Sequence, residues 1–253
     1  MTAACFFQEV TMNAEMEKNV QILKKWIEES RSIVFFGGAG VSTESGIPDF
    51  RSVDGLYHQK YRYPPEQIIS RSFFEAQPEE FYRFYRDKLI VRGAEPNVTH
   101  RRLAELEREG KLKAVVTQNI DGLHQLAGSR NVLELHGSTL RNYCQRCGKT
   151  YGTEIFDDTE GVPYCTCGGI IRPDIVLYEE GLDQDVIERS VQAIRHADLL
   201  IVGGTSLVVY PAAGLLRYYR GNRLVLINMS PTSMDGAADL LISAKLGEVF
   251  SRV

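Results

Sequence analysis

The 253-residue sequence predicts an α/β protein built on a doubly wound, Rossmann-like parallel sheet. Five short apolar runs predict its strands: "SIVFFGG", "KAVVTQ", "NVLELHG", "ADLLIVGG" and "RLVLINM". Continuous apolar runs without polar alternation are typical of strands that are buried on both faces. Helical patterns such as "THRRLAELERE" and "QDVIERSVQAIRHA" separate most of them, as crossovers between parallel strands require.

The stretch before the first apolar run predicts a helix. In "EMEKNVQILKKWIEES", Val20, Leu23, Trp26 and Ile27 recur at helical spacing. Asn13 stands shortly before this stretch and is available as the N-terminal cap. We therefore expect the helix to begin near Asn13.

Two stretches interrupt the alternation of strands and helices. Residues 51–96, rich in Arg, Tyr, Phe and Pro, predict a small helical insert, and residues 138–175 hold four cysteines. No repeat or low-complexity linker separates them from the rest, so the sequence predicts one domain over residues 14–253. Its Rossmann-like core is expected to comprise residues 14–50, 97–137 and 176–253.

Charge and hydropathy argue against several classes of protein. A formal net charge of −4 gives the chain no general attraction for nucleic acid or for an anionic membrane. No apolar run approaches the roughly 20 residues that span a bilayer, and the first residues do not resemble a signal peptide. We therefore expect a cytoplasmic protein with no nucleic-acid partner and no membrane partner.

Polar and glycine-rich segments follow the five predicted strands. These segments are "GGAG", "QNID", "HGS", "GGTS" and "INMS". In doubly wound sheets, ligands bind beyond the carboxyl ends of the strands. The sequence therefore predicts a ligand crevice that these segments line together.

The segment "GGAGVSTESGIPDFR", residues 37–51, carries part of a dinucleotide-binding signal. Gly38 and Gly40 permit close approach of a phosphate, and Ser42 and Thr43 add donors. The full GxGxxG fingerprint needs a third glycine where Thr43 stands, and no acidic residue ends a second strand about 20 residues later. An ordinary dehydrogenase is therefore disfavoured, and a plain structural turn remains an alternative.

Four of the five cysteines lie within 24 residues and predict a metal site. They are Cys144, Cys147, Cys165 and Cys167. Four thiolates suit one structural Zn(II) ion and leave no open position for a catalytic water, while reduced free thiols or another metal are the alternatives. The second pair is CxC, which makes closure of the site harder. Cys5 is expected to be an incidental thiol.

His136 is the histidine best placed for catalysis. It follows a predicted strand beside Gly137, where a side chain can face the crevice. An imidazole with a pKa of about 6.5 is the natural general base near neutral pH. His124, at a probable helix start, is expected to be structural.

Several segments, taken together and in order, resemble the sirtuin family, the NAD-dependent protein-lysine deacylases. The segments are "GAGVSTESGIPDFR", "TQNIDGLH", "LELHG", the four cysteines, "RPDIVLYEE" and "GTSLVVYPAA". They cover the chain from about residue 33 onward and are similar to the compact bacterial and archaeal members. The resemblance implies that NAD is consumed as a co-substrate, which accounts for the missing third glycine and ribose-binding acid.

The resemblance also implies roles for individual residues. The expected NAD-binding residues are Ala39, Gly40, Thr43, Phe50, Arg51, Gln118, Ile120, Asp121, Thr205, Ser206, Asn228 and Lys245. Asn119 and His136 are the expected catalytic residues, with His136 as general base toward the ribose hydroxyls. The implied products are nicotinamide, free lysine and O-acetyl-ADP-ribose.

The implied partner is an acetyl-lysine protein or peptide. It would pair as an added strand with "DIVLYEEG" and with backbone near "GGTSLVVY", and Val176 would flank the acyl-lysine tunnel. Family members that remove succinyl or malonyl groups carry Tyr-x-x-Arg in the insert, where this chain has Tyr82 and Tyr85, with Arg86 one position late. A buried carboxylate without a guanidinium partner is costly, so neutral acyl groups are expected.

Two other functions remain open from the sequence. A protein ADP-ribosyltransferase would use the same cleavage of NAD. A non-enzymatic zinc-ribbon module that binds nucleic acid or protein is the other alternative, although the acidic balance and the crevice segments disfavour it.

Overall fold

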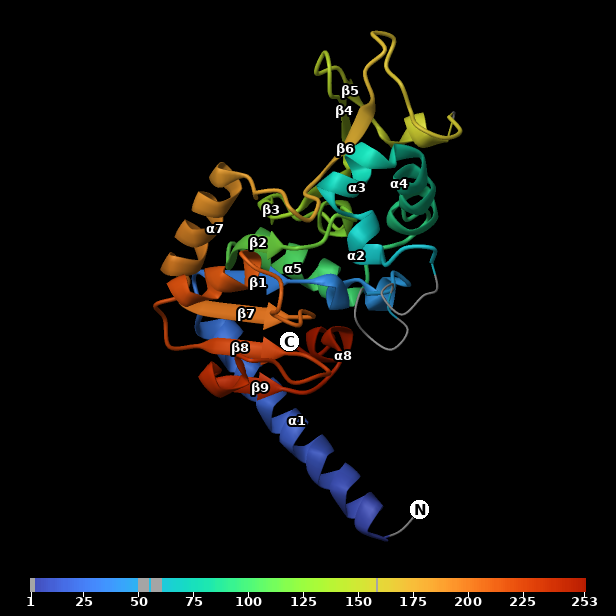
Figure 1. Cartoon of the computed structure of the whole chain (residues 1–253). Helices are drawn as coiled ribbons and strands as arrows, with labels where there is room; N and C mark the ends of the chain where they lie inside the picture. The colour runs from blue at the N-terminus through green and yellow to red at the C-terminus, as the bar shows by residue number, and fades with distance from the viewer. Residues whose placement is uncertain (1–2, 50–54, 56–60, 158) are drawn as a thin grey trace.

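The computed structural model describes residues 3–49, 55, 61–157 and 159–253, with side chains from residue 14 onward (Figure 1). Within these residues, six parallel strands form the main sheet in the order β3-β2-β1-β7-β8-β9. The strands are β1 (Ile33–Gly37), β2 (Leu112–Thr117), β3 (Val132–Glu134), β7 (Leu199–Gly203), β8 (Leu224–Ile227) and β9 (Leu240–Ile242). The predicted fold class is confirmed.

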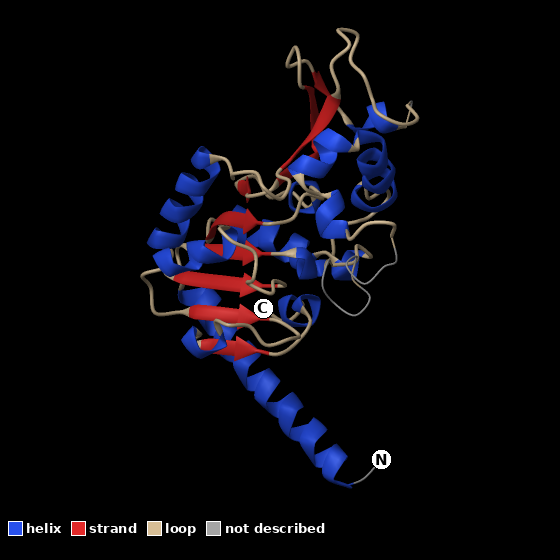
Figure 2. Cartoon of the chain, in the orientation of Figure 1, coloured by secondary structure: helices blue, strands red, loops and turns tan. Residues whose placement is uncertain are grey.

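Helices cover both faces of this sheet (Figure 2). They are α1 (Ala3–Glu29), α5 (Val98–Arg108), α7 (Gln184–His196), α8 (Leu246–Phe250) and the 3₁₀ helix η6 (Ala212–Tyr218). Successive residues of a strand point to opposite faces, so Phe35 packs with Leu23 of α1, whereas Phe36 packs with Ile194 of α7. Because both faces are covered, β1 and β7 are buried along their whole length, as their apolar sequences predict.

The first helix begins much earlier than expected. α1 starts at Ala3, so Asn13 lies inside the helix and the prediction that it is the N-terminal cap is wrong. An Asn inside a helix costs at most about 0.7 kcal/mol relative to Ala, which neighbouring Ala, Gln, Glu and Met residues offset. Figure 1 shows the first turns of α1 extending beyond the sheet.

The insert and the cysteine-bearing stretch lie together on one side of the main sheet (Figure 1). The insert contains α2 (Pro65–Ile68), α3 (Arg71–Ala76), α4 (Pro78–Phe84) and the π-helical turn η4 (Tyr85–Leu89). The cysteine-bearing stretch forms an antiparallel sheet of β5 (Thr150–Tyr151), β4 (Gly137–Cys144) and β6 (Ile171–Ile175), with η5 (Thr153–Phe156) beside it. A buried cluster that includes Phe74, Phe81 and Phe156 packs the two against each other.

Short helical segments complete the described chain. They are η1 (Ala39–Val41), η2 (Thr43–Ser45), α6 (Leu123–Leu126) and η7 (Asp235–Ala237). Within the described ranges, no helix has both the length and the apolar character needed to cross a membrane.

The layered core predicts a sharp contrast between two leucines in neighbouring strands. Leu226→Ala in β8 removes a fully buried side chain, so we expect the free energy of unfolding to fall by about 2 to 5 kcal/mol. Leu241→Ala in β9, where the side chain is 39% exposed, should cost less than about 1 kcal/mol. Urea denaturation of both variants measures the difference, and equal losses would contradict the layer assignment.

Candidate active site

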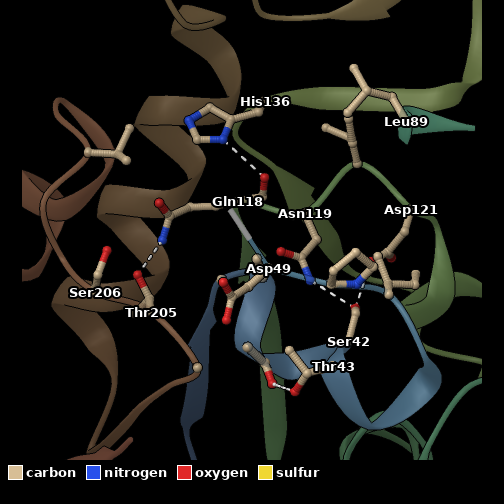
Figure 3. A pocket seen from close by; sticks show the side chains of 18 of the residues that line it. Ser42, Thr43, Asp49, Leu89, Gln118, Asn119, Asp121, His136, Thr205 and Ser206 are labelled. Carbon is tan, nitrogen blue, oxygen red and sulfur yellow. Dashed lines mark hydrogen bonds between the residues drawn. The ribbon is translucent and has the colours of Figure 1, made fainter. Parts of the chain in front are cut away.

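The carboxyl ends of the central strands open into one large cavity. Its volume is about 580 Å³, and residues that follow β1, β2, β3, β7 and β8 line it (Figure 3). The sheet order places β2 and β3 on one side of β1 and β7 to β9 on the other. The cavity therefore lies at the point where the strand order reverses, where doubly wound sheets bind their ligands.

Two glycines bring the loops after β1 and β7 into backbone contact. The amide of Gly40 donates to the carbonyl of Gly204 over 2.8 Å. A Cβ at Gly40 would lie 2.7 Å from the Gly204 Cα, and Gly204 has a φ of 62°, which favours glycine. Neither position tolerates a side chain, so the loop that carries Thr43 is held close to the sheet.

The polar side chains after β2 form a connected network with this loop (Figure 3). Asn119 Nδ2 donates to Ser42 Oγ over 3.0 Å, and Ser42 Oγ donates to Asp121 Oδ2 over 2.6 Å. Asn119 and Ser42 are buried. Because each group has a partner, the network costs little to bury and fixes the orientation of both side chains that follow the strand.

A second chain of contacts links the ends of β2, β7 and β8. Gln118 Nε2 donates to Thr205 Oγ1 over 2.9 Å, and the amide of Thr205 donates to Asn228 Oδ1 over 3.0 Å. The ends of strands on both sides of β1 are thus joined. This contact places Gln118, Thr205 and Asn228 in fixed positions along the cavity.

His136 lies between β3 and β4 with its ring toward the cavity (Figure 3). Its Nδ1 lies 3.0 Å from the carbonyl oxygen of Gln118. A carbonyl only accepts, so Nδ1 carries the proton and Nε2 keeps a free lone pair. Burial lowers the pKa of His136, and the bond to the Gln118 carbonyl opposes that shift only in part. This is the state that a general base needs.

The segment that follows β6 forms a second wall of the cavity, in addition to the residues that follow the strands of the main sheet. The amide of Val176 donates to the carbonyl of His136 over 3.0 Å, and the amide of Tyr178 donates to the carbonyl of Ile69 over the same distance. The segment therefore runs between the core and the insert.

Tyr82 and Tyr85, the two residues compared with the Tyr-x-x-Arg pattern, are not among the residues that line the cavity. Both are fully buried in the cluster between the insert and the cysteine-bearing sheet, and Tyr82 Oη donates to the carbonyl of Ile171 over 2.6 Å. Arg86 bonds Thr159 there. Lys88, in the π-helical turn η4, does line the cavity. The preference for neutral acyl groups stays a prediction.

All the predicted catalytic, NAD-binding and substrate-binding residues within the described ranges line this one cavity. They are Ala39, Gly40, Thr43, Gln118, Asn119, Ile120, Asp121, His136, Val176, Thr205, Ser206, Asn228 and Lys245. Phe50 and Arg51 lie outside the described residues. The sequence reasoning missed Glu44, whose carboxylate accepts from the amide of Gly247 over 2.7 Å and so ties the loop after β1 to α8. Its place inside the glycine-rich segment was the available signal.

The other buried histidines are structural, as predicted for His124. Burial lowers the pKa of His124 to about 3 and that of His100 to about 4, so both stay neutral near pH 7. His100 Nδ1 accepts from the amide of Asn97 and completes a capping box at the start of α5. The Asn97 side chain in turn donates to the carbonyl of Val41 over 2.7 Å, and this bond connects the loop after β1 to the start of α5.

The four cysteines form a compact sulfur cluster. The sulfur atoms of Cys144, Cys147, Cys165 and Cys167 all lie within 4.8 Å of one another. The Cys144–Cys167 and Cys147–Cys165 sulfur distances are 3.4 and 3.6 Å. A disulfide needs about 2.05 Å, whereas thiolates about 2.3 Å from a tetrahedral zinc lie roughly 3.8 Å apart. The cluster therefore fits one Zn(II) ion.

Two glycines follow the CxC pair and allow both of its sulfur atoms to lie in the cluster. Gly168 has a φ of 78°, and a Cβ at Gly169 would lie 2.6 Å from Cys144 Sγ. Tyr151 Oη donates to Cys165 Sγ over 3.0 Å and helps to orient that ligand. The cluster lies away from His136, which agrees with a structural role.

Comparison with known proteins gives one consistent result. A family model described as the Sir2 family matches residues 38–211. An NAD-dependent protein deacetylase of Clostridium acetobutylicum is 61% identical over 235 residues, which is 91% of this chain and 96% of that protein. An NAD-dependent protein deacetylase of Clostridium perfringens is 59% identical over 242 residues, 94% of this chain and 99% of that protein.

Solved structures agree with the sequence relatives. One described as "Sir2-p53 peptide-NAD+" superposes with a TM-score of 0.82 at 42% identity and covers 92% of this chain and 96% of that chain. That description names both an NAD molecule and a peptide bound to a protein similar to this one.

The sulfur cluster predicts zinc content. We expect the purified protein to hold about one zinc ion per chain, because four thiolates at this spacing saturate a tetrahedral ion. Cys165→Ser should lose most of the metal and lower the melting temperature, whereas Cys5→Ser should keep it. Elemental analysis of the three proteins measures this. A Cys165→Ser protein with full zinc content would contradict the assignment.

Proposed function

The chain belongs to the Sir2 family, and we infer from this membership and from its site that it is an NAD-dependent protein deacetylase. It transfers the acetyl group of a modified lysine to ADP-ribose, giving nicotinamide, free lysine and O-acetyl-ADP-ribose. NAD is therefore a co-substrate, and an acetyl-lysine protein or peptide is the other substrate. His136 and the polar groups from neighbouring strand ends face a single cavity, and this arrangement carries the inference.

We propose that the cavity residues divide the NAD molecule between them. Gln118, Asn119, Ile120 and Asp121 would surround the nicotinamide and its ribose. Thr205 and Ser206, with Asn228 and Lys245, would bind the remaining part of the dinucleotide. The support is that all of them line one cavity and that hydrogen bonds hold Asn119, Thr205 and Asn228 in place there. Phe50 and Arg51 are proposed to complete the NAD site by resemblance alone.

We propose that His136 is the general base of the second chemical step. Nicotinamide leaves C1′ of the ribose and the acetyl oxygen bonds to the same carbon, so the site must orient the amide and exclude water. His136 Nε2 would then take a proton from the ribose hydroxyls, so that the 2′ oxygen closes on the amidate carbon. Addition of water and departure of the lysine amine complete the reaction.

We propose that the chain is one catalytic domain over residues 14–253 with two grafted modules. The support is the shared buried cluster between the insert and the cysteine-bearing sheet, and the direct contact of both with the cavity wall. The zinc ion holds the long connection between β4 and β6 together. It supplies no chemistry at His136, because four protein ligands complete its coordination.

The two alternative functions are less well supported. An ADP-ribosyltransferase would use the same NAD site, but the similar proteins of Clostridium acetobutylicum and Clostridium perfringens are named NAD-dependent protein deacetylases. A zinc-ribbon binding module would not need the buried network of Ser42, Asn119 and Asp121. Nicotinamide release that requires an acetyl-lysine peptide separates the deacetylase from both.

We propose a cytoplasmic location. The support is the sulfur spacing of the four described cysteines, which suits a metal and not disulfides, because disulfide frames are typical of oxidising compartments.

The products of the reaction test the function directly. Mass spectrometry of NAD incubated with an acetyl-lysine peptide should show nicotinamide, free-lysine peptide and O-acetyl-ADP-ribose. His136→Ala should lower the rate of O-acetyl-ADP-ribose formation by about 10² to 10⁴, because the general base is lost. His196→Ala, at the exposed end of α7, is the matched control and should keep wild-type activity. Full activity of His136→Ala would remove that residue from its role.

The pH dependence of the rate tests the protonation state of His136. Burial lowers its pKa from 6.5, and only the neutral ring can accept a proton. The acid limb of the kcat/KM profile should therefore have its midpoint below pH 6.5. A pH profile with saturating co-substrate measures this, and an acid limb with its midpoint above 6.5 would contradict the environment described for the ring.

A further inference from the structure

Glu179 has a backbone conformation that L-residues rarely adopt. Its φ is 75°, and among the described non-glycine residues only Leu207, with a φ of 56°, shares a positive value. The two lie on the two segments expected to hold the substrate peptide, and Glu179 itself lines the cavity. A strained residue persists only where its surroundings over-determine it, and such residues cluster at functional sites. Glycine would adopt this conformation without strain.

The side chain of Glu179 makes a contact that glycine cannot make. Its Oε2 accepts from the amide of Ser72 and its Oε1 accepts from Ser72 Oγ, both over 2.9 Å. Ser72 belongs to α3 of the insert. The backbone beside it is tied to the same place, because the amide of Arg71 donates to the carbonyl of Tyr178 over 3.0 Å. Glu179 thus fastens the segment after β6 to the helical insert.

The next residue fastens the same segment on its other side. Glu180 Oε2 accepts from Arg172 Nη2 over 2.5 Å and from the amide of Leu177 over 2.9 Å. Arg172 lies on β6 of the zinc-binding sheet, and this ion pair is mostly buried. The two neighbouring carboxylates therefore bond different parts of the structure. Glu180 bonds the zinc-binding sheet, and Glu179 bonds the insert.

We propose that Glu179 is a positioning residue for the peptide substrate, retained despite its backbone strain because its carboxylate fixes residues 175–180 in the shape that receives an extended chain. The proposal rests on the deacetylase function and deepens it. A preformed backbone binds an added strand more tightly than a mobile one, because less conformational entropy is lost on binding. The Glu179 carboxylate bonds Ser72 of the insert and not the residues proposed to bind NAD, so the effect should be confined to the peptide.

Three substitutions separate the backbone strain from the carboxylate contact. Glu179→Gly removes both, so its melting temperature should lie above that of Glu179→Ala while the peptide KM rises about fivefold. Glu179→Ala keeps the strain and loses the contact, so it should show the same rise in KM with a lower melting temperature. Glu179→Gln should stay near the wild type, because its amide oxygen can accept from Ser72 N while its amide nitrogen donates to Ser72 Oγ. The KM for NAD and kcat should stay unchanged throughout.

Hydrogen exchange provides a readout that does not depend on catalysis. The amides of Leu177 and Tyr178 should exchange faster in Glu179→Gly than in the wild type and should be restored in Glu179→Gln. A wild-type peptide KM in Glu179→Gly, or an equal rise in the KM for NAD, would overturn the proposal. Absence of deacetylation by the wild type would refute the deacetylase function, and the exchange rates would still decide whether Glu179 fixes the segment.

Discussion

The structure depends on the backbone contact between Gly40 and Gly204 where β1 and β7 end. The two loops can approach so closely only because neither carries a side chain at this point. Their contact holds the loop after β1 over the strand ends, so that Ser42 reaches Asn119 and Asp121. The networks that position the proposed NAD-binding groups therefore follow from one steric constraint at the centre of the sheet.

The sequence predicted the elements whose burial is uniform. Strands such as β1 and β7 are covered on both faces and therefore appear as continuous apolar runs. β9 was missed because it has three residues, one of them exposed, and such a run cannot be distinguished from a loop. The prediction that Asn13 caps the first helix was wrong because a residue that favours the cap position is also tolerated inside a helix. The free-energy cost is too small to decide where the helix starts.

The site likewise contains residues that could be predicted from the sequence and residues that could not. Residues directly after strands, such as Gln118 and Thr205, could be placed because parallel strands end together. The burial of Tyr82 and Tyr85 against Phe156 could not be predicted, because it depends on packing between two segments far apart in the sequence. The sequence also could not decide whether both sulfur atoms of the CxC pair join the cysteine cluster, because this depends on the backbone conformation of Gly168 and on the space beside Gly169.

The outermost strands of the main sheet have a consequence for the behaviour of the protein in concentrated solution. β3 and β9 each have only three residues. An unpaired sheet margin exposes backbone amides and carbonyls that can recruit another chain and seed aggregation, and short margins are one way in which proteins limit this risk. The six-stranded sheet therefore ends on both sides in strands too short to template growth.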